Sequence, residues 1–150
     1  MIKKPATELL LVEDDPNDVE LAFIALRKHN LNDRVQVARD GEEALDFLFC
    51  RGTHAARTFD SPPRLVLLDL KLPKVSGVEV LKAIKNDPRT RPIPVTVLTS
   101  SRQQDDMNNC YQLGANSYIQ KPIDFDRFQK MIDDLGYYWL SVNQSLPLKL

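Results

Sequence analysis

The sequence has few cysteines and histidines and no long hydrophobic run. Its 150 residues include two cysteines, Cys50 and Cys110, and two histidines, His29 and His54, with no three of them close together. Zinc sites need several such residues at short spacing, so a zinc-dependent function is not indicated, and the cysteines fit reduced thiols. The first apolar run, Leu9–Val12, is too short for a signal peptide or a membrane span. We therefore expect a cytoplasmic protein.

Neither sign of charge dominates, and glycine is scarce. There are 20 basic and 21 acidic residues, which leaves a net charge of −1. This balance argues against a surface that binds nucleic acid or a membrane through bulk charge. Acidic residues, not glycines, follow the first apolar run, which argues against a flavin-binding or nucleotide-binding module with a glycine-rich phosphate loop. Apolar residues make up 43% of the chain and charged residues 27%, as in ordinary soluble domains.

What the sequence does have is an alternation of short apolar segments with amphipathic ones. The apolar segments predict five strands, at Glu8–Val12, Arg34–Ala38, Arg64–Asp69, Ile93–Leu98 and Asn116–Ile119. Apolar residues at helical spacing predict a helix after each strand, the last two at Ser101–Leu113 and Asp124–Trp139. Alternating strands and helices predict an α/β fold with a doubly wound, five-stranded parallel sheet, flavodoxin-like, in the strand order 2-1-3-4-5.

Polar side chains follow four of the predicted strands. They are Glu13, Asp14 and Asp15 after the first, Asp69 at the end of the third, Thr99 after the fourth and Lys121 after the fifth. Because the carboxyl ends of parallel strands meet at one edge of a sheet, we expect these side chains to share a crevice. Asp15 precedes Pro16 and is the natural cap of the first helix.

Several carboxylates in one crevice repel each other unless a cation lies among them. Mg²⁺ is the cation that prefers carboxylate and carbonyl oxygens. A carboxylate can also attack a phosphoryl group, and a lysine and a hydroxyl can then bind the phosphoryl oxygens. Taken singly, the Thr99 hydroxyl could simply form a hydrogen bond within a turn, and Lys121 could be a surface lysine. The hypothesis of phosphoryl transfer therefore depends on their joint placement.

The chain resembles the receiver domain of two-component response regulators. The motifs that carry the resemblance are LLLVEDDPND, LVLLDLKLPKVSG, VTVLTSS and NSYIQKPID, one for each of four strands. The resemblance covers about residues 8–139, with residues 140–150 as a C-terminal tail. It implies a single receiver domain over residues 1–150 that accepts a phosphoryl group and is not otherwise an enzyme.

The resemblance also implies a role for each site residue. Asp69 matches the phosphoacceptor, Thr99 the switch hydroxyl and Lys121 its ion-pair partner. Tyr118 matches the aromatic side chain whose rotamer follows the switch hydroxyl. Asp14, Asp69 and the backbone carbonyl of Lys71 match the Mg²⁺ ligands, with Glu13 in the second shell or bound through water. The Lys121–Pro122 bond matches a peptide bond that is often cis in the family.

More narrowly, the chain is similar to stand-alone regulators that pair with phytochrome-type sensor kinases. The resemblance implies a sensor histidine kinase as phosphodonor, and a phosphotransfer protein or a downstream effector as further partners. The eleven residues after Trp139 are too few for an output domain, so we expect signalling through association. A homodimer through the fourth helix, fifth strand and fifth helix is typical of the family.

Two other functions remain open on the sequence. Phosphatases of the haloacid dehalogenase type also use a strand-end aspartate, in a D-x-D-x-T pattern. Here Lys71 and Pro73 stand at the second and third conserved positions of that pattern, so its general acid is missing. A pseudo-receiver would bind partners without phosphorylation, but it would be expected to have a damaged acidic site, and this one has all its parts.

Overall fold

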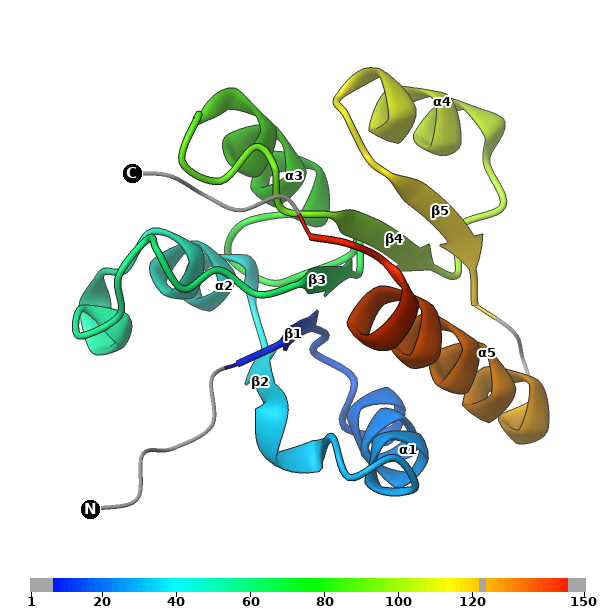
Figure 1. The fold of residues 1–150 in the computed structure, drawn as a ribbon. Coiled ribbons are helices and arrows are strands. Elements are labelled where there is room, and N and C mark those ends of the chain that lie inside the picture. Colours follow the sequence, from blue (N-terminus) through cyan, green and yellow to red (C-terminus); the bar gives the residue numbers. More distant parts are fainter. Residues whose placement is uncertain (1–6, 122–123, 146–150) are drawn as a thin grey trace, which may run out of the picture.

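The sheet has the predicted architecture. The computed structural model describes residues 7–121 and 124–145. Its five parallel strands lie in the order β2-β1-β3-β4-β5 (Figure 1). The strands are β1 (Leu9–Val12), β2 (Val35–Ala38), β3 (Leu65–Leu68), β4 (Val95–Thr99) and β5 (Ser117–Gln120). Both the predicted fold class and the predicted strand order are confirmed.

Five α-helices connect or follow the strands. They are α1 (Pro16–Arg27), α2 (Gly41–Leu48), α3 (Gly77–Asn86), α4 (Gln104–Gln112) and α5 (Phe125–Tyr137). Helices α1 and α5 cover one face of the sheet, and α2, α3 and α4 cover the other (Figure 1). Because β1 and β3 lie between two helical layers, every residue of both strands is buried.

The boundaries differ from the prediction by more than one residue at three places. Strand β4 begins at Val95, not at Ile93, because Pro94 has no N–H to donate to a sheet. Helix α4 begins at Gln104, three residues later than expected, because the Ser101 hydroxyl accepts a hydrogen bond from the backbone of Gln103 and holds an extended turn there. Helix α5 ends at Tyr137 and continues as a π-helical turn, Tyr138–Val142.

Acidic and hydroxyl side chains fix the helix starts. The side chain of Asp15 accepts a hydrogen bond from the backbone N–H of Asn17 at 2.8 Å, which confirms its predicted role as the cap of α1. Equivalent caps begin α2, α3 and α5, at Asp40, Ser76 and Asp124 respectively. These caps satisfy backbone N–H groups that have no partner within the helix.

At the opposite, amino edge of the sheet, Lys85 joins α3 to the strands. Its ammonium donates to the carbonyl oxygens of Arg91 (2.9 Å) and Ile93 (2.8 Å) and to Asn116 Oδ1 (3.1 Å). The same Asn116 oxygen accepts from the backbone N–H of Val95 at 2.9 Å. Burial lowers the pKa of Lys85 to about 8. This network aligns the starts of β4 and β5.

The long connection between α2 and β3 folds back on the domain and does not project from it. The Arg57 guanidinium lies 3.7 Å from the centroid of the Phe47 ring and donates to the carbonyl oxygens of Phe47 and Ser61.

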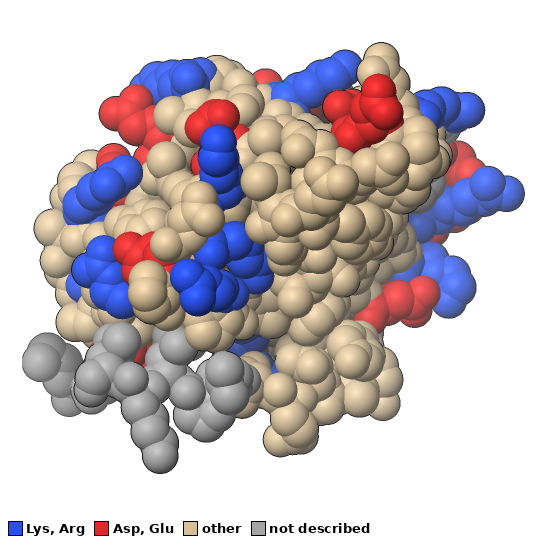
Figure 2. All heavy atoms as spheres, turned by 90° about the horizontal axis from the view of Figure 1, so that it is seen from above, with Lys and Arg blue, Asp and Glu red and all other residues tan. Residues whose placement is uncertain are grey.

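On the face seen in Figure 2, basic and acidic side chains are interspersed around a broad uncharged area. Among the described residues, no helix has the length and apolar character needed to cross a bilayer.

Candidate functional site

The carboxyl ends of the strands bring the predicted acidic residues together. Carboxylate oxygens of Glu13, Asp14 and Asp69 all lie within 4.8 Å of one another. Glu13 and Asp14 directly follow β1, and Asp69 directly follows β3, its parallel neighbour. Asp14 is exposed, whereas Glu13 and Asp69 are buried. The cluster thus opens to solvent on the side of Asp14.

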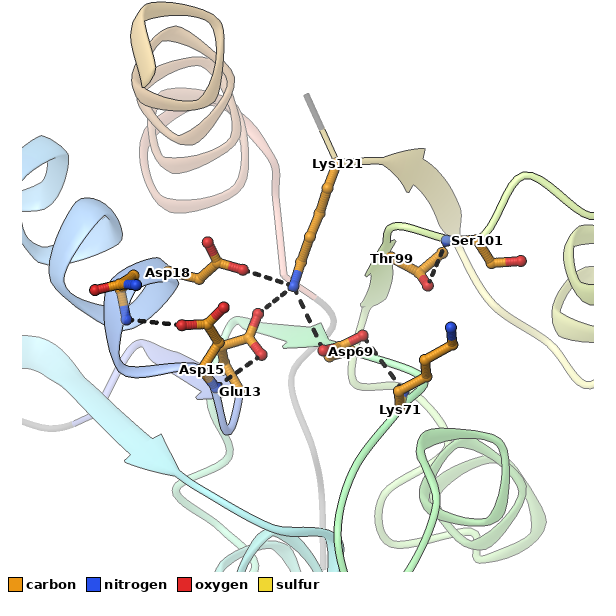
Figure 3. A network of polar contacts seen from close by, with 9 residues as sticks. Glu13, Asp15, Asp18, Asp69, Lys71, Thr99, Ser101 and Lys121 are labelled. Atoms are coloured by element: carbon orange, nitrogen blue, oxygen red, sulfur yellow. Dashed lines mark hydrogen bonds and ion pairs between the residues drawn. The ribbon is translucent and has the colours of Figure 1, made fainter. Parts of the chain in front are cut away.

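Lys121 lies over this cluster, as Figure 3 shows. Its ammonium nitrogen is 2.5 Å from Glu13 Oε1 and 3.4 Å from Asp69 Oδ2. A third carboxylate, that of Asp18, lies 2.8 Å away. The sequence argument missed Asp18 because it considered only residues at strand ends, and Asp18 belongs to the first turn of α1. The signal that could have found it is its place in LLLVEDDPND, one helical turn from the acidic pair.

The charges in the site shift one another's pKa values. Burial, together with the Asp69 charge, raises the pKa of Glu13 to about 8, against the effect of its hydrogen bond to Lys121. Burial alone would lower the pKa of Lys121, but its hydrogen bonds to Asp18 and Glu13 and the charge of Asp69 raise it above the usual value. The charged form of Lys121 is therefore favoured in this site.

Close packing of the following loop places the Asp69 carboxylate. The backbone N–H of Asp69 donates to Val12 O at 3.1 Å, and the N–H of Lys71 lies 3.4 Å from Asp69 Oδ1. A Cβ added at Gly77 would lie only 2.1 Å from the Asp69 carbonyl oxygen. Only glycine therefore lets the start of α3 approach the end of β3 this closely.

Thr99, the last residue of β4, and Ser101 after it lie beside Asp69 of the acidic cluster (Figure 3). Thr99 is fully buried, and its hydroxyl accepts a hydrogen bond from the backbone N–H of Ser101 at 3.1 Å. No hydrogen bond joins Thr99 to Asp69 within the described part of the chain. The Ser101 hydroxyl in turn donates to Asp106 at 2.5 Å, in the first turn of α4. Thr99 is thus linked to α4 through one residue.

Tyr118 lies on β5 near the same loop. Its hydroxyl is buried and has no hydrogen-bond partner among the described residues. Burial raises the pKa of Tyr118, and the neighbouring Ser101 hydroxyl partly offsets that shift. The side chain lines an open pocket of about 280 Å³, together with Ser101, Arg102, Gln103, Gln104, Met107 and Gln120. The predicted Lys121–Pro122 peptide bond lies outside the described residues.

The acidic cluster fits a divalent metal ion. It offers three carboxylates within one ion's reach, and hard cations such as Mg²⁺ take oxygen ligands of this kind. The Lys71 backbone, which approaches Asp69 Oδ1 through its N–H, borders the cluster. In Figure 3 the Lys71 side chain extends beside Asp69 without a drawn contact to it.

Comparison with known proteins points to one family. Residues 9–133 match the response regulator receiver domain. The chain is 41% identical over 137 residues to the probable methanogenesis regulatory protein FilR2 of Methanothrix harundinacea, covering 91% of this chain and 86% of FilR2. It is 38% identical over 137 residues to the response regulator Rcp1 of Synechocystis, covering 91% of this chain and 90% of Rcp1.

Solved structures agree with these matches. The structure of the phosphorylated cyanobacterial phytochrome response regulator RcpA superposes with a TM-score of 0.86 at 36% identity, covering 94% of this chain and 99% of RcpA. Rcp1, in its Mn²⁺-bound form, superposes with a TM-score of 0.86 at 35% identity, covering 95% of this chain and 99% of Rcp1.

Proposed function

The chain belongs to the response regulator receiver family, and from this membership we propose that Asp69 is its phosphoacceptor. Phosphorylation of an aspartate and the use of Mg²⁺ are general properties of the family. The observation that carries the proposal is the position of the Asp69 carboxylate, buried at the end of β3 with the Lys121 ammonium 3.4 Å away and two further carboxylates beside it.

The donor is the phosphorylated histidine of a sensor kinase. One Asp69 carboxylate oxygen attacks phosphorus, an O–P bond forms, and the P–N bond to the donor imidazole breaks, with the electron pair leaving on the imidazole nitrogen. The Lys121 ammonium then donates hydrogen bonds to the transferred group. The fixed loop between Asp69 and Gly77 keeps the attacking oxygen in place.

Asp14, Asp69 and the backbone carbonyl of Lys71 would hold a Mg²⁺ ion, with Glu13 bound to it through water. When bound, the ion neutralises charge on the phosphoryl oxygens. The exposure of Asp14 supports this assignment, because an exchangeable ion needs a route from solvent. The short contact between Glu13 and Lys121 supports the second-shell role of Glu13.

Phosphorylation changes the surface through Thr99 and Tyr118. Thr99 turns its hydroxyl toward the phosphoryl group and releases the N–H of Ser101, which loosens the start of α4. Tyr118 then moves inward, and the equilibrium of the face formed by α4, β5 and α5 shifts. Within the described parts of the chain the Tyr118 hydroxyl has no hydrogen-bond partner, and a pocket lies beside it; both support this step because they leave room for rearrangement.

Receiver domains pair with histidine kinases, and the likeness to Rcp1 and RcpA supports a phytochrome-type kinase as donor. We place signalling in association with a phosphotransfer protein or effector and in a homodimer through α4, β5 and α5. Exposed Tyr111 on α4 and Phe125 on α5 support that face as an interface. A monomer at high concentration, with and without phosphorylation, would contradict the homodimer.

The test of the proposed function is intact mass after incubation with acetyl phosphate. We expect a gain of one phosphoryl group with Mg²⁺, loss of that gain with excess chelator, and no gain in Asp69→Asn. Equal labelling of Asp69→Asn would place the phosphoryl group elsewhere. Steady release of inorganic phosphate from a phosphate ester would instead favour a hydrolase.

A further inference from the structure

The geometry points to Asp18 as the residue that positions Lys121 for phosphoryl transfer. This inference rests on the proposed function and adds a residue to the same site. An ammonium group has three N–H donors, and here each has a carboxylate partner: Glu13 at 2.5 Å, Asp18 at 2.8 Å and Asp69 at 3.4 Å. The contact with Asp18 is shorter than the contact with the proposed phosphoacceptor.

Asp18 differs from the other two partners in one respect. Glu13 and Asp69 belong to the acidic cluster that fits a divalent ion, and Asp18 does not. An ion bound there would engage the Asp69 carboxylate directly and Glu13 through water, and its charge would repel the Lys121 ammonium. Asp18 is then the carboxylate that still neutralises and orients Lys121.

The start of α1 leaves the Asp18 side chain free for this role. The first backbone donors of the helix are satisfied by other residues: Asn17 N–H donates to Asp15 Oδ1 at 2.8 Å, and Asp15 N–H donates to Glu13 Oε2 at 3.3 Å. The Asp18 carboxylate therefore points across to Lys121 (Figure 3). A carboxylate in the first helical turn is also favoured by the helix dipole.

Lys121 needs such a second anchor. Its backbone N–H donates a hydrogen bond to Thr99 O at 2.7 Å, which fixes only the base of the side chain. The side chain beyond is long and has several rotatable bonds, and ordering it costs conformational entropy. Asp18, on a rigid helix, holds the far end of that side chain above Asp69. The ammonium is then in place before the phosphoryl group arrives.

The test is a double-mutant cycle of Asp18→Asn and Lys121→Ala, with the rate of labelling by acetyl phosphate measured at saturating Mg²⁺. Asp18→Asn alone should lower the maximal rate about tenfold, the size expected for a lost charge-assisted hydrogen bond. In the Lys121→Ala background it should lower the rate no further. Asp18→Glu, which keeps the charge, should recover most of the wild-type rate. Glu20→Gln, which removes a charge from an exposed position of the same helix, should label like wild type.

Two results would overturn the inference while leaving the proposed function intact. One is a wild-type rate in Asp18→Asn. The other is an equal loss with and without Lys121, because a general disturbance of α1 would have that effect. If the wild type takes no label, the proposed function fails. The wild type, the two single variants Asp18→Asn and Lys121→Ala, and the double variant are then compared by Mn²⁺ titration. Weaker Mn²⁺ binding in Asp18→Asn only when Lys121 is present would sustain the part of the inference that has Asp18 neutralising Lys121, and any other pattern would refute that part too.

Discussion

The backbone N–H of Lys121 donates a hydrogen bond to the carbonyl oxygen of Thr99 at 2.7 Å. The two residues follow or end neighbouring strands, β5 and β4, so this bond extends the pairing of the sheet to the site itself. The Thr99 hydroxyl and the Lys121 ammonium are therefore carried by directly hydrogen-bonded backbone segments. Under the proposed function, both side chains reach the phosphoryl group from this one paired unit.

Lys121→Ala separates the role of the Lys121 backbone from that of its ammonium group. The backbone bond to Thr99 remains, but the phosphoryl oxygens lose their ammonium donor. We expect residual labelling by acetyl phosphate, slower by at least about tenfold, since such electrostatic contacts contribute on this scale. Changes in Tyr118 fluorescence or NMR shifts on β5 should be weak even when the protein is labelled. A full conformational response in the labelled variant would contradict the role of Lys121.

Gly77→Ala tests the close packing behind Asp69. The new Cβ would lie 2.1 Å from Asp69 O and 2.6 Å from Leu70 Cα, so the loop must shift. We expect slower labelling and a loss of roughly 1–3 kcal/mol in the free energy of unfolding, measured with urea. The matched control is Gly136→Ala in α5, where the nearest atoms are 3.8 Å away. That change should stabilise the fold by about 0.5–1 kcal/mol. Equal effects of the two changes would refute this account of Gly77.

Tyr118→Phe removes a buried hydroxyl without a hydrogen-bond partner among the described residues. Because a buried unpaired polar group costs free energy, the variant should be as stable as wild type or more stable by up to about 1 kcal/mol. Tyr111→Phe, on the exposed side of the same aromatic pair, is the control and should change little. A clear loss of stability in Tyr118→Phe would mean that its hydroxyl is paired in solution.

Lys85→Met tests the network at the amino edge of the sheet. The change keeps much of the aliphatic chain but removes the donor shared by Arg91 O, Ile93 O and Asn116 Oδ1. We expect a loss of about 1–3 kcal/mol in urea unfolding, with labelling of the folded protein unchanged. Lys82→Met, at an exposed position of the same helix, should have little effect. A neutral result for Lys85→Met would show that water replaces these hydrogen bonds.

The fold could be predicted because its signals are local. Buried runs such as Leu65–Leu68 and the Asp15–Pro16 helix start each identify an element from a few adjacent residues. The late start of α4 could not be predicted in the same way. The Ser101 hydroxyl accepts a hydrogen bond from the backbone N–H of Gln103, and this local bond competes with the helical conformation.

The candidate site could be predicted only where it follows strand ends. The sheet topology alone brings Glu13, Asp14 and Asp69 together. In the structure, carboxylate oxygens of these three residues lie within 4.8 Å of one another. Asp18 contributes through the orientation of a helix, which the sequence pattern does not specify. The roles of Thr99 and Tyr118 depend on the phosphorylated state and that of Lys71 on a bound metal ion, so these roles stay predictions.

The most direct test of the central claim is to identify the phosphorylated residue chemically. Wild-type protein labelled with acetyl phosphate and Mg²⁺ is reduced with sodium borohydride, which converts an aspartyl phosphate to homoserine, and its peptides are sequenced by mass spectrometry. The account predicts homoserine at position 69 and at no other aspartate. Homoserine at Asp14 or Asp18, or a phosphoryl group on a serine or threonine, would contradict it.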